Sequence, residues 1–272
     1  DLKNKRIVYF VTDYNEGDVA IRSMTYPSTT NICRIVLYDT TTDSVNILVE
    51  GNFLNFSKSH RITGVNIIDD LVFWTDNRNQ PRKINIAKAL TSPTHYQYEE
   101  QISVAKVAPY MPIQLVDSSG NSVLSRDTSI KSDYLRFNFV RFSYRYKFED
   151  GEYSTIAPFT QILFEPLNSG VVVESDNAKN ATGSGTSAEE PRVATSKQNI
   201  YKKTTVDIMQ NKINQAELRV PLPSLNEHKT SSGTWSNDLK ITNIEILSKE
   251  SDGPSVKVVK DIKVSGSVLL DP

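Results

Sequence analysis

Short apolar runs separated by turn-forming residues dominate residues 5–90 of this chain. The clearest example is LVFWTDNRNQPRKINI, Leu71–Ile86, in which a run containing Trp stops at Thr-Asp and a second run follows a polar turn. Runs of this length, rich in Val, Ile, Phe and Tyr and bounded by Asp, Asn or Gly, are typical of half-buried antiparallel strands. The sequence therefore predicts an all-β unit here, with a short helix only over INIAKAL, residues 84–90.

One strand pattern occurs twice. Val8–Asp13 (VYFVTD) and Leu71–Asp76 (LVFWTD) both close an apolar run with Thr-Asp, and positions 13 and 76 are 63 residues apart. Propeller blades repeat about every 40–50 residues, and an insertion at Glu16–Thr30 would account for the excess. We therefore predict an incomplete β-propeller over residues 1–95. Its structural blade motif is Phe73, Trp74, Thr75 and Asp76, with a partial copy at Thr12 and Asp13.

A polar, proline-containing linker over residues 96–131 separates this unit from a second one. After it, the alternating pattern of YLRFNFVRFSYRYKF predicts a long hairpin strand that turns at Asp150-Gly151, and a later hairpin turns at Asp252-Gly253. Two hairpins of this kind predict a β-sandwich of the immunoglobulin or fibronectin type over residues 132–272. The Ser-, Thr- and Gly-rich stretch at about 168–196 predicts a flexible insertion within it.

Composition limits the chemistry. The formal net charge is −1, which gives no global argument for binding nucleic acid or an anionic membrane. Cys33 is the only cysteine, the three histidines are far apart, and no apolar run approaches the ~20 residues of a membrane span. Neighbouring carboxylates such as Asp69 and Asp70 favour turns over an acid/base pair, because adjacent strand residues point to opposite faces. We predict no enzymatic activity, no catalytic, cofactor-binding or metal-binding residue, no cofactor and no small-molecule substrate.

The segment GVNIIDDLVFWTDNRNQPRKINIAKA resembles a blade of YWTD-type propellers. That resemblance implies that Trp74 packs between neighbouring blades, while Thr75 and Asp76 satisfy backbone donors at the strand end. Only Phe73–Asp76 follows the pattern closely, since the earlier copy has Val11 in place of Trp.

A longer series is similar to the tail muzzle, or tail stabilisation, proteins of crAss-like bacteriophages and their podovirus relatives. It comprises DDLVFWTDNRNQPRKINI, FVRFSYRYKFEDGEYSTIAPFTQILFEP, ELRVPLP and ITNIEILSKESDGPSVKVVKDI, within residues 60–265. The resemblance implies a virion structural protein: a ring of copies at the distal end of a short tail, built from propeller and fibronectin-type domains around the DNA exit channel. Its implied partners are other copies of itself, neighbouring tail proteins and genomic DNA in passage during ejection.

Two blades are too few to close a propeller, which needs about four to eight. We therefore expect the open sheet edges of this chain to be covered by other protein segments. The chain starts at Asp1 without an initiator Met, so we also expect a processed piece or a fragment of a longer protein. Two alternatives stay open. One is a ligand-binding YWTD-type ectodomain, which would call for a cysteine-rich module that Cys33 alone cannot supply; the other is a carbohydrate-active propeller enzyme that Asp76→Asn would inactivate.

Overall fold

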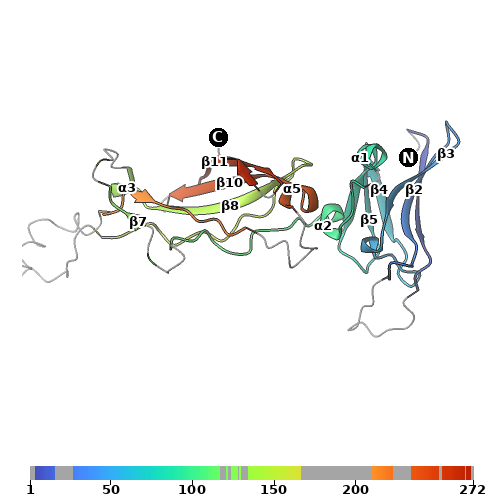
Figure 1. The fold of residues 1–272 in the computed structure, drawn as a ribbon, viewed down its shortest axis with the longest axis horizontal. Coiled ribbons are helices and arrows are strands. Elements are labelled where there is room, and N and C mark those ends of the chain that lie inside the picture. The colour runs from blue at the N-terminus through green and yellow to red at the C-terminus, as the bar shows by residue number, and fades with distance from the viewer. Residues whose placement is uncertain are drawn as a thin grey trace, which may run out of the picture.

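The computed structural model describes residues 4–15, 27–92, 94–116, 121, 124–127, 129, 134–166, 210–222, 234–250, 253–266 and 268–270. These residues form an elongated molecule in which two modules follow one another along the long axis (Figure 1). We call residues 4–104 the N-terminal module and residues 105–270 the C-terminal module. Most of the regular structure is antiparallel β-sheet, as predicted, and none of the described sheets is closed.

The N-terminal module contains two three-stranded antiparallel sheets, ordered β1-β2-β3 and β4-β5-β6. Their strands are β1 (Arg6–Thr12), β2 (Cys33–Asp39), β3 (Ser44–Glu50), β4 (Gly64–Ile68), β5 (Leu71–Thr75) and β6 (Arg82–Asn85). Three short helices complete the module: η1 (Asn52–Leu54), α1 (Ile86–Thr91) and α2 (Glu99–Ile102). The strands match the predicted apolar runs, and α1 is the helix predicted over INIAKAL. Asn85 begins α1 because its side chain accepts a hydrogen bond from the Lys88 amide.

The two copies of the Thr-Asp strand do not occupy equivalent positions. β1 is an edge strand of its sheet, whereas β5 is the central strand of the other. The sequence repeat between Val8–Asp13 and Leu71–Asp76 therefore does not correspond to two superimposable three-stranded blades. Both strands end at a Thr-Asp pair whose aspartate accepts backbone hydrogen bonds. Asp13 accepts one from the Ile32 amide, and Asp76 accepts one from the Asn79 amide in the turn that follows β5.

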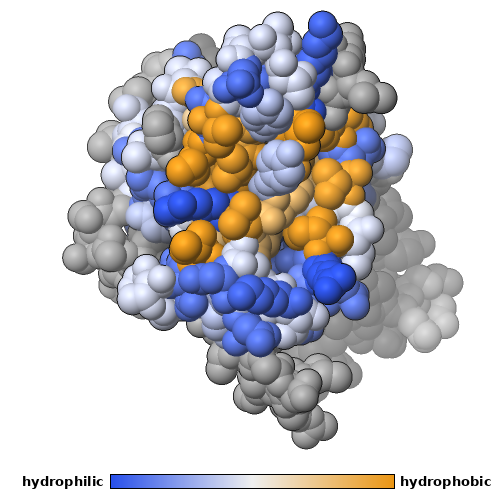
Figure 2. Space-filling model, turned by 90° about the vertical axis from the view of Figure 1, so that its right-hand side faces the viewer, coloured by the Kyte–Doolittle hydropathy of each residue, from blue (hydrophilic) through white to orange (hydrophobic). Residues whose placement is uncertain are grey.

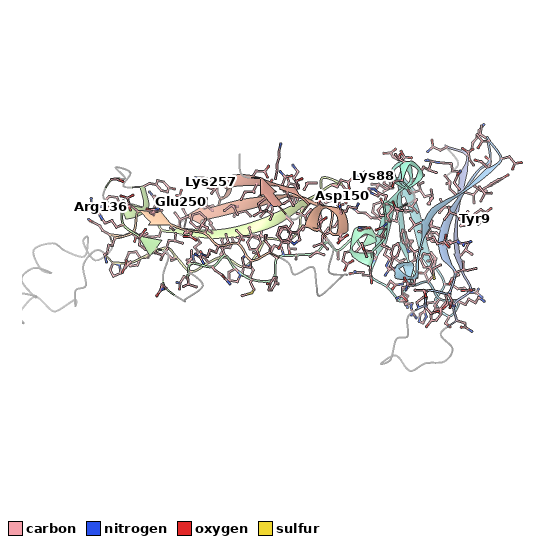
Figure 3. All side chains as sticks on the ribbon, viewed as in Figure 1. Tyr9, Lys88, Arg136, Asp150, Glu250 and Lys257 are labelled. Carbon is pink, nitrogen blue, oxygen red and sulfur yellow. The ribbon has the colours of Figure 1, made fainter. Side chains whose placement is uncertain are left out.

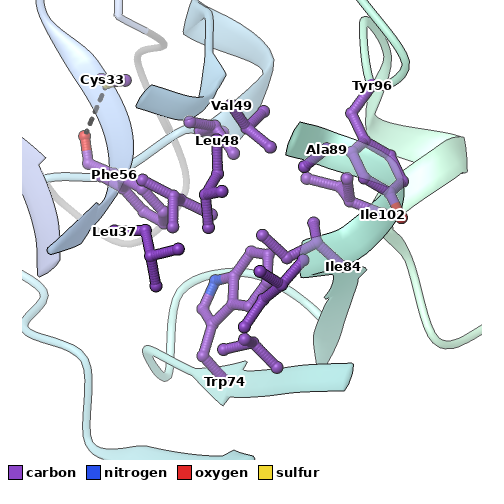
Figure 4. Packing of buried hydrophobic residues seen from close by; sticks show 14 residues of the cluster. Cys33, Leu37, Leu48, Val49, Phe56, Trp74, Ile84, Ala89, Tyr96 and Ile102 are labelled. Atoms are coloured by element: carbon purple, nitrogen blue, oxygen red, sulfur yellow. Dashed lines mark hydrogen bonds between the residues drawn. The ribbon is translucent and has the colours of Figure 1, made fainter. Parts of the chain in front are cut away.

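The two sheets pack face to face around one core (Figure 4). Trp74 of β5 is 2% exposed, and its ring centroid lies 5.5 Å from that of Phe10 of β1 and 6.3 Å from that of Phe56. Aromatic contacts of this kind add to the free energy gained by burying apolar surface. Tyr96 and Ile102, which the sequence placed in the linker, also belong to this core.

The C-terminal module is built on one four-stranded antiparallel sheet, ordered β12-β11-β10-β8. Its strands are β8 (Val140–Phe148), β10 (Ile241–Glu250), β11 (Val256–Ser265) and β12 (Val268–Leu270). The smaller elements are β7 (Leu124–Ser125), β9 (Gln215–Ala216), α3 (Tyr134–Phe137) and α5 (Trp235–Asp238). The two predicted hairpins thus contribute to the same sheet, because β10 pairs directly with β8, and they do not form two facing sheets.

Extended segments form a second layer over one face of this sheet. Gln114 and Arg219 exchange backbone hydrogen bonds of 2.8 and 3.1 Å, which pairs two non-adjacent parts of the chain. Tyr144 of β8 donates its hydroxyl to the Pro221 carbonyl at 2.7 Å. The buried aromatic rings of β8, including Tyr146 and Phe148, lie in the resulting core.

The return arm after the Asp150-Gly151 turn is not a regular strand. Residues 154–163 donate a backbone hydrogen bond to β8 at every third position, while the accepting carbonyls on β8 are two residues apart. The pairs are Ser154 with Tyr146, Ala157 with Tyr144, Thr160 with Phe142, and Leu163 with Val140. A spacing of three is that of an extended, polyproline-like conformation. The Ser154 and Thr160 hydroxyls accept hydrogen bonds from β8 amides at 3.0 and 3.1 Å, which compensates for the missing ladder contacts.

Other predictions fall partly outside the described residues. The insertion at 168–196, the residue Asp252 and most of Glu16–Thr30 lie there. Gly253 is described, and its amide donates to the Glu250 carbonyl at 3.2 Å at the end of β10.

Candidate interaction surface

The sheet β1-β2-β3 has two unlike faces. Its inner face packs against β5 and β6, and Cys33, Ile35 and Leu37 of β2 are completely buried there. Its other face, which we call the outer face, carries three rows of side chains across β1, β2 and β3. The rows are Ile7, Tyr38 and Val45; Tyr9, Val36 and Ile47; and Val11, Arg34 and Glu50.

The outer face is apolar over two of these rows and exposed. Val45 is 68% exposed, Tyr9 47% and Ile47 46%. Figure 2 shows apolar side chains gathered on this end of the molecule with polar side chains around them. Contiguous exposed apolar surface is uncommon on monomeric soluble proteins and is typical of protein interfaces. The strand pairing makes this patch rigid, since every second residue is held on the same side of the sheet.

Polar residues border the outer face on two sides. Arg34 and Glu50 form a salt bridge at 2.7 Å, and their opposite charges leave the third row neutral as a whole. At the other end, Tyr38 donates its hydroxyl to Asp43 at 2.7 Å, and this hydrogen bond raises the pKa of Tyr38. Both contacts fix the direction of side chains that flank the apolar rows.

The structure places the predicted blade motif on both sides of β5. Trp74 points into the core between the sheets, whereas Phe73 lies on the opposite side of the strand, paired in register with Lys83. Thr75 is exposed, and its carbonyl accepts a hydrogen bond from the Thr63 amide at 2.8 Å.

Asp76 is 2% exposed and organises the turn after β5. Its Oδ1 accepts hydrogen bonds from the amides of Arg78 and Asn79 at 3.0 and 2.8 Å, and its Oδ2 accepts from Asn79 Nδ2 at 2.6 Å. These bonds satisfy backbone donors at the end of the strand.

In the first copy of the motif, Thr12-Asp13, the aspartate binds a residue that is farther away in the sequence than those bound by Asp76. Asp13 Oδ1 accepts a hydrogen bond from the Ile32 amide at 2.7 Å, directly before β2. Thr12 Oγ1 accepts from the Tyr14 amide at 3.1 Å and lies 3.4 Å from Cys33 Sγ. Asp13 therefore ties the end of β1 to the start of its neighbour, whereas Asp76 holds the turn that follows its own strand.

The predicted turn at Asp150-Gly151 lies at the junction of the two modules. Gly151 has a φ of 81°, a left-handed conformation that glycine adopts without strain. Asp150 Oδ2 lies 3.3 Å from Lys83 Nζ and 2.8 Å from Lys106 Nζ, and Glu152 also pairs with Lys83. The two lysine side chains are only 7% and 8% exposed. We call this cluster, together with the pair of Lys88 and Glu149 at 2.9 Å, the junction cluster.

Electrostatics in the junction cluster favour the charged forms of its acids. Burial raises the pKa of Asp150, but the ammonium groups of Lys106 and Lys83 more than offset this effect, so the pKa lies below its ordinary value. The pKa of Glu149 is lowered in the same way, with Lys88 outweighing burial. Figure 3 shows Lys88 and Asp150 on facing modules, with Tyr9 on the far side of the N-terminal module.

Two polar contacts at or near the junction carried no motif in the sequence. Gln101 of α2 donates from Nε2 to the carbonyls of Asn237 and Asp238, both at 3.0 Å, and so joins the modules a second time. Arg82 of β6 is completely buried and donates from Nη2 to Glu99 at 2.6 Å, which positions α2. Both residues have ordinary polar and apolar neighbours in the sequence, and these gave no sign of the contacts.

The described part of the chain contains no group of three or more His, Cys, Asp or Glu side chains arranged to hold a metal ion. No helix in the same residues is long and apolar enough to cross a bilayer. A scan of protein-family models found no match, and comparisons with curated proteins and with solved structures found no significant similarity.

Proposed function

We propose that this chain is a structural subunit of a short-tailed phage tail, part of a multimeric ring or muzzle around the DNA exit channel. The observation that supports the proposal is the outer face of β1-β2-β3. A rigid sheet that buries one face in its own core and exposes Tyr9 and Ile47 on the other, with the partly buried Val36 between them, is suited to pack against a further β-sheet.

The finer architecture belongs to the same proposal. The N-terminal module is interpreted as two propeller-like blades, with Trp74 packed between them, and the C-terminal module as a fibronectin-like sandwich whose second layer is made of extended segments. An open β-assembly with free edges needs covering partners, which a ring of copies or neighbouring tail proteins would provide. The proposed location in the virion rests on the resemblance of sequence segments within residues 60–265 to tail muzzle proteins.

Immunogold labelling of purified virions tests the location. Antibodies raised against this chain should place gold particles at the distal end of the tail in negative-stain images. Label confined to the head, or no label on intact virions, would reject the proposal.

A pair of variants tests the surface. Val36→Glu with Ile47→Glu adds charge to the outer face without disturbing the inner one, so we expect tails assembled with this variant to contain much less of the chain. Val258→Glu with Val259→Glu changes two exposed residues of β11 in the C-terminal module and is the matched control, expected to assemble normally. Equal incorporation of both variants would contradict assembly through the outer face. Circular dichroism spectra of the purified chains would verify that each variant is folded.

A further inference from the structure

A groove of about 980 Å³ lies beside β1 in the N-terminal module. β1 and β4 form two of its walls, and the segment around Phe56–Ile62 lines the rest. This groove adjoins the outer face, since Ile7 and Tyr9 belong to both, but it follows the free edge of β1 and not one side of its sheet. The groove borders β4 and the junction cluster borders β6, so the two lie at opposite edges of the sheet β4-β5-β6.

Both strands that border the groove have a free edge. Within the described residues, β1 pairs only with β2, and β4 pairs only with β5. In an antiparallel strand, alternate residues direct their N–H and C=O groups away from the existing neighbour. Alternate residues of the seven-residue strand β1 therefore present backbone donors and acceptors toward the groove, which is the arrangement that an added strand requires.

The groove is basic. Its lining includes Arg6, Lys58, His60 and Arg61, and none of the described lining residues is Asp or Glu. Arg6 is paired with Asp70 at 3.0 Å, whereas Lys58 and Arg61 are exposed on the loop between η1 and β4. The chain as a whole has a net charge of −1, so this cationic lining is a local feature. It favours a ligand that carries carboxylates.

Apolar side chains complete the lining. Val8, Phe10, Ile62 and Ile67 are partly buried against the core, and Val65 of β4 is exposed. An extended peptide places successive side chains on opposite sides, so apolar residues at alternate positions can contact this lining while acidic residues reach the basic rim.

We propose that this groove binds an extended acidic segment of a partner protein, which adds as a strand to the free edge of β1. Nucleic acid would satisfy Lys58 and Arg61 but would leave the backbone groups of β1 and the apolar lining without matching partners. A peptide strand matches all three features at once. This inference does not depend on the location of the chain in a phage tail.

Fluorescence anisotropy with defined peptides tests the proposal. The probe is a fluorescein-labelled peptide of seven residues, the length of β1, with alternating Glu and Val, titrated with the full chain. We expect saturable binding. The same peptide with Lys in place of Glu should bind at least tenfold more weakly because of the basic lining, a difference of about 1.4 kcal/mol. A version of the acidic peptide N-methylated at alternate residues should also lose at least tenfold, because it cannot pair with β1 along that edge.

Charge-reversal variants locate the site. Lys58→Glu with Arg61→Glu alters two exposed side chains of the groove and should weaken binding of the acidic peptide at least tenfold. Lys257→Glu with Lys263→Glu makes the same change of charge on β11 and should leave binding unchanged. No binding of the acidic peptide, or equal binding of its N-methylated version, would overturn the proposal. Tighter binding of a single-stranded oligonucleotide that carries the same number of negative charges would overturn it in favour of a polyanion site.

Discussion

Lys83 Nζ of the N-terminal module lies 3.3 Å from Asp150 Oδ2 of the C-terminal module. The two residues are far apart in sequence, and the contact depends on two local structures: strand β6 directs Lys83 out of its sheet, and the tight turn after β8 presents Asp150. Because the lysine side chain is almost completely buried, its charge needs this partner. The pair therefore fixes the modules to one another.

Replacing Lys83 should weaken the protein more than replacing an exposed lysine. Lys83→Met leaves Asp150 and Glu152 with one fewer cation, and we expect the free energy of unfolding to fall by about 1–3 kcal/mol. Lys257→Met removes a lysine that is 69% exposed and lies 3.5 Å from Glu250, so it should change stability by about 0.5 kcal/mol or less. Urea denaturation measures both. Equal effects would mean that the junction cluster contributes no more than a surface pair.

The junction cluster should lose stability in acid. The folded-state pKa values of Asp150 and Glu149 lie below their ordinary values of 3.8 and 4.5. Depressed pKa values stabilise the folded state fully above those ordinary values, and this contribution is lost as the pH falls through the lower folded values. The contribution of Asp150 and Glu149 to the free energy of unfolding should therefore be nearly constant between pH 7 and 5. It should decline below about pH 4. Asp150→Asn should reduce stability at pH 7 and flatten the acid limb of the curve, as measured by urea denaturation at each pH. An unchanged acid limb would contradict this assignment.

Within the Thr-Asp motif, the aspartate should matter more than the threonine. Asp76→Ala leaves the amides of Arg78 and Asn79 without their acceptor in a buried turn, and we expect a loss of about 1–2 kcal/mol. Thr75→Ala removes an exposed side chain and should cost about 0.5 kcal/mol or less. Thermal unfolding followed by circular dichroism distinguishes the two. A larger loss of stability for Thr75→Ala would show that the motif acts through a contact other than the hydrogen bonds that Asp76 accepts.

The return arm beside β8 can be tested at Thr160. Its Oγ1 accepts a hydrogen bond from the Phe142 amide at 3.1 Å, and Thr160→Val keeps the shape of the side chain while removing that acceptor. We expect a loss of about 1 kcal/mol, because the partly buried Phe142 amide is left without its acceptor. Thr155→Val, at an exposed position of the same arm, is the control and should be close to neutral. Hydrogen exchange of the Phe142 amide should become faster only in Thr160→Val.

Local patterns were sufficient to predict the strands and the first helix. The run at Leu71–Thr75 became β5, and the apolar residues at Cys33–Asp39 became β2, because alternation in a half-buried strand is encoded by neighbouring residues. Asp76 was also predicted as a strand stop from its position alone. These features depend on interactions within a few residues of the chain.

Features that depend on distant residues were not predicted. The order of strands in each sheet puts β1 at an edge and β5 at the centre, although their sequences are similar. The period of three in residues 154–163 arises from pairing with β8 and does not follow a period-two pattern. Arg82 and Gln101 make their contacts across the fold, so nothing adjacent to them in the sequence indicated a role.

The end-to-end order of the modules has a mechanical consequence. A pulling force applied to opposite ends of the long axis must pass through the junction, where the modules are joined by Gln101 and by the ion pairs of Lys83 and Lys88 (Figure 1). Each module is held internally by strand ladders whose many hydrogen bonds share a load. Under tension we expect the junction to separate first while both modules stay folded, so the molecule would lengthen in a step set by the connecting chain, and salt would lower the force at which that step occurs.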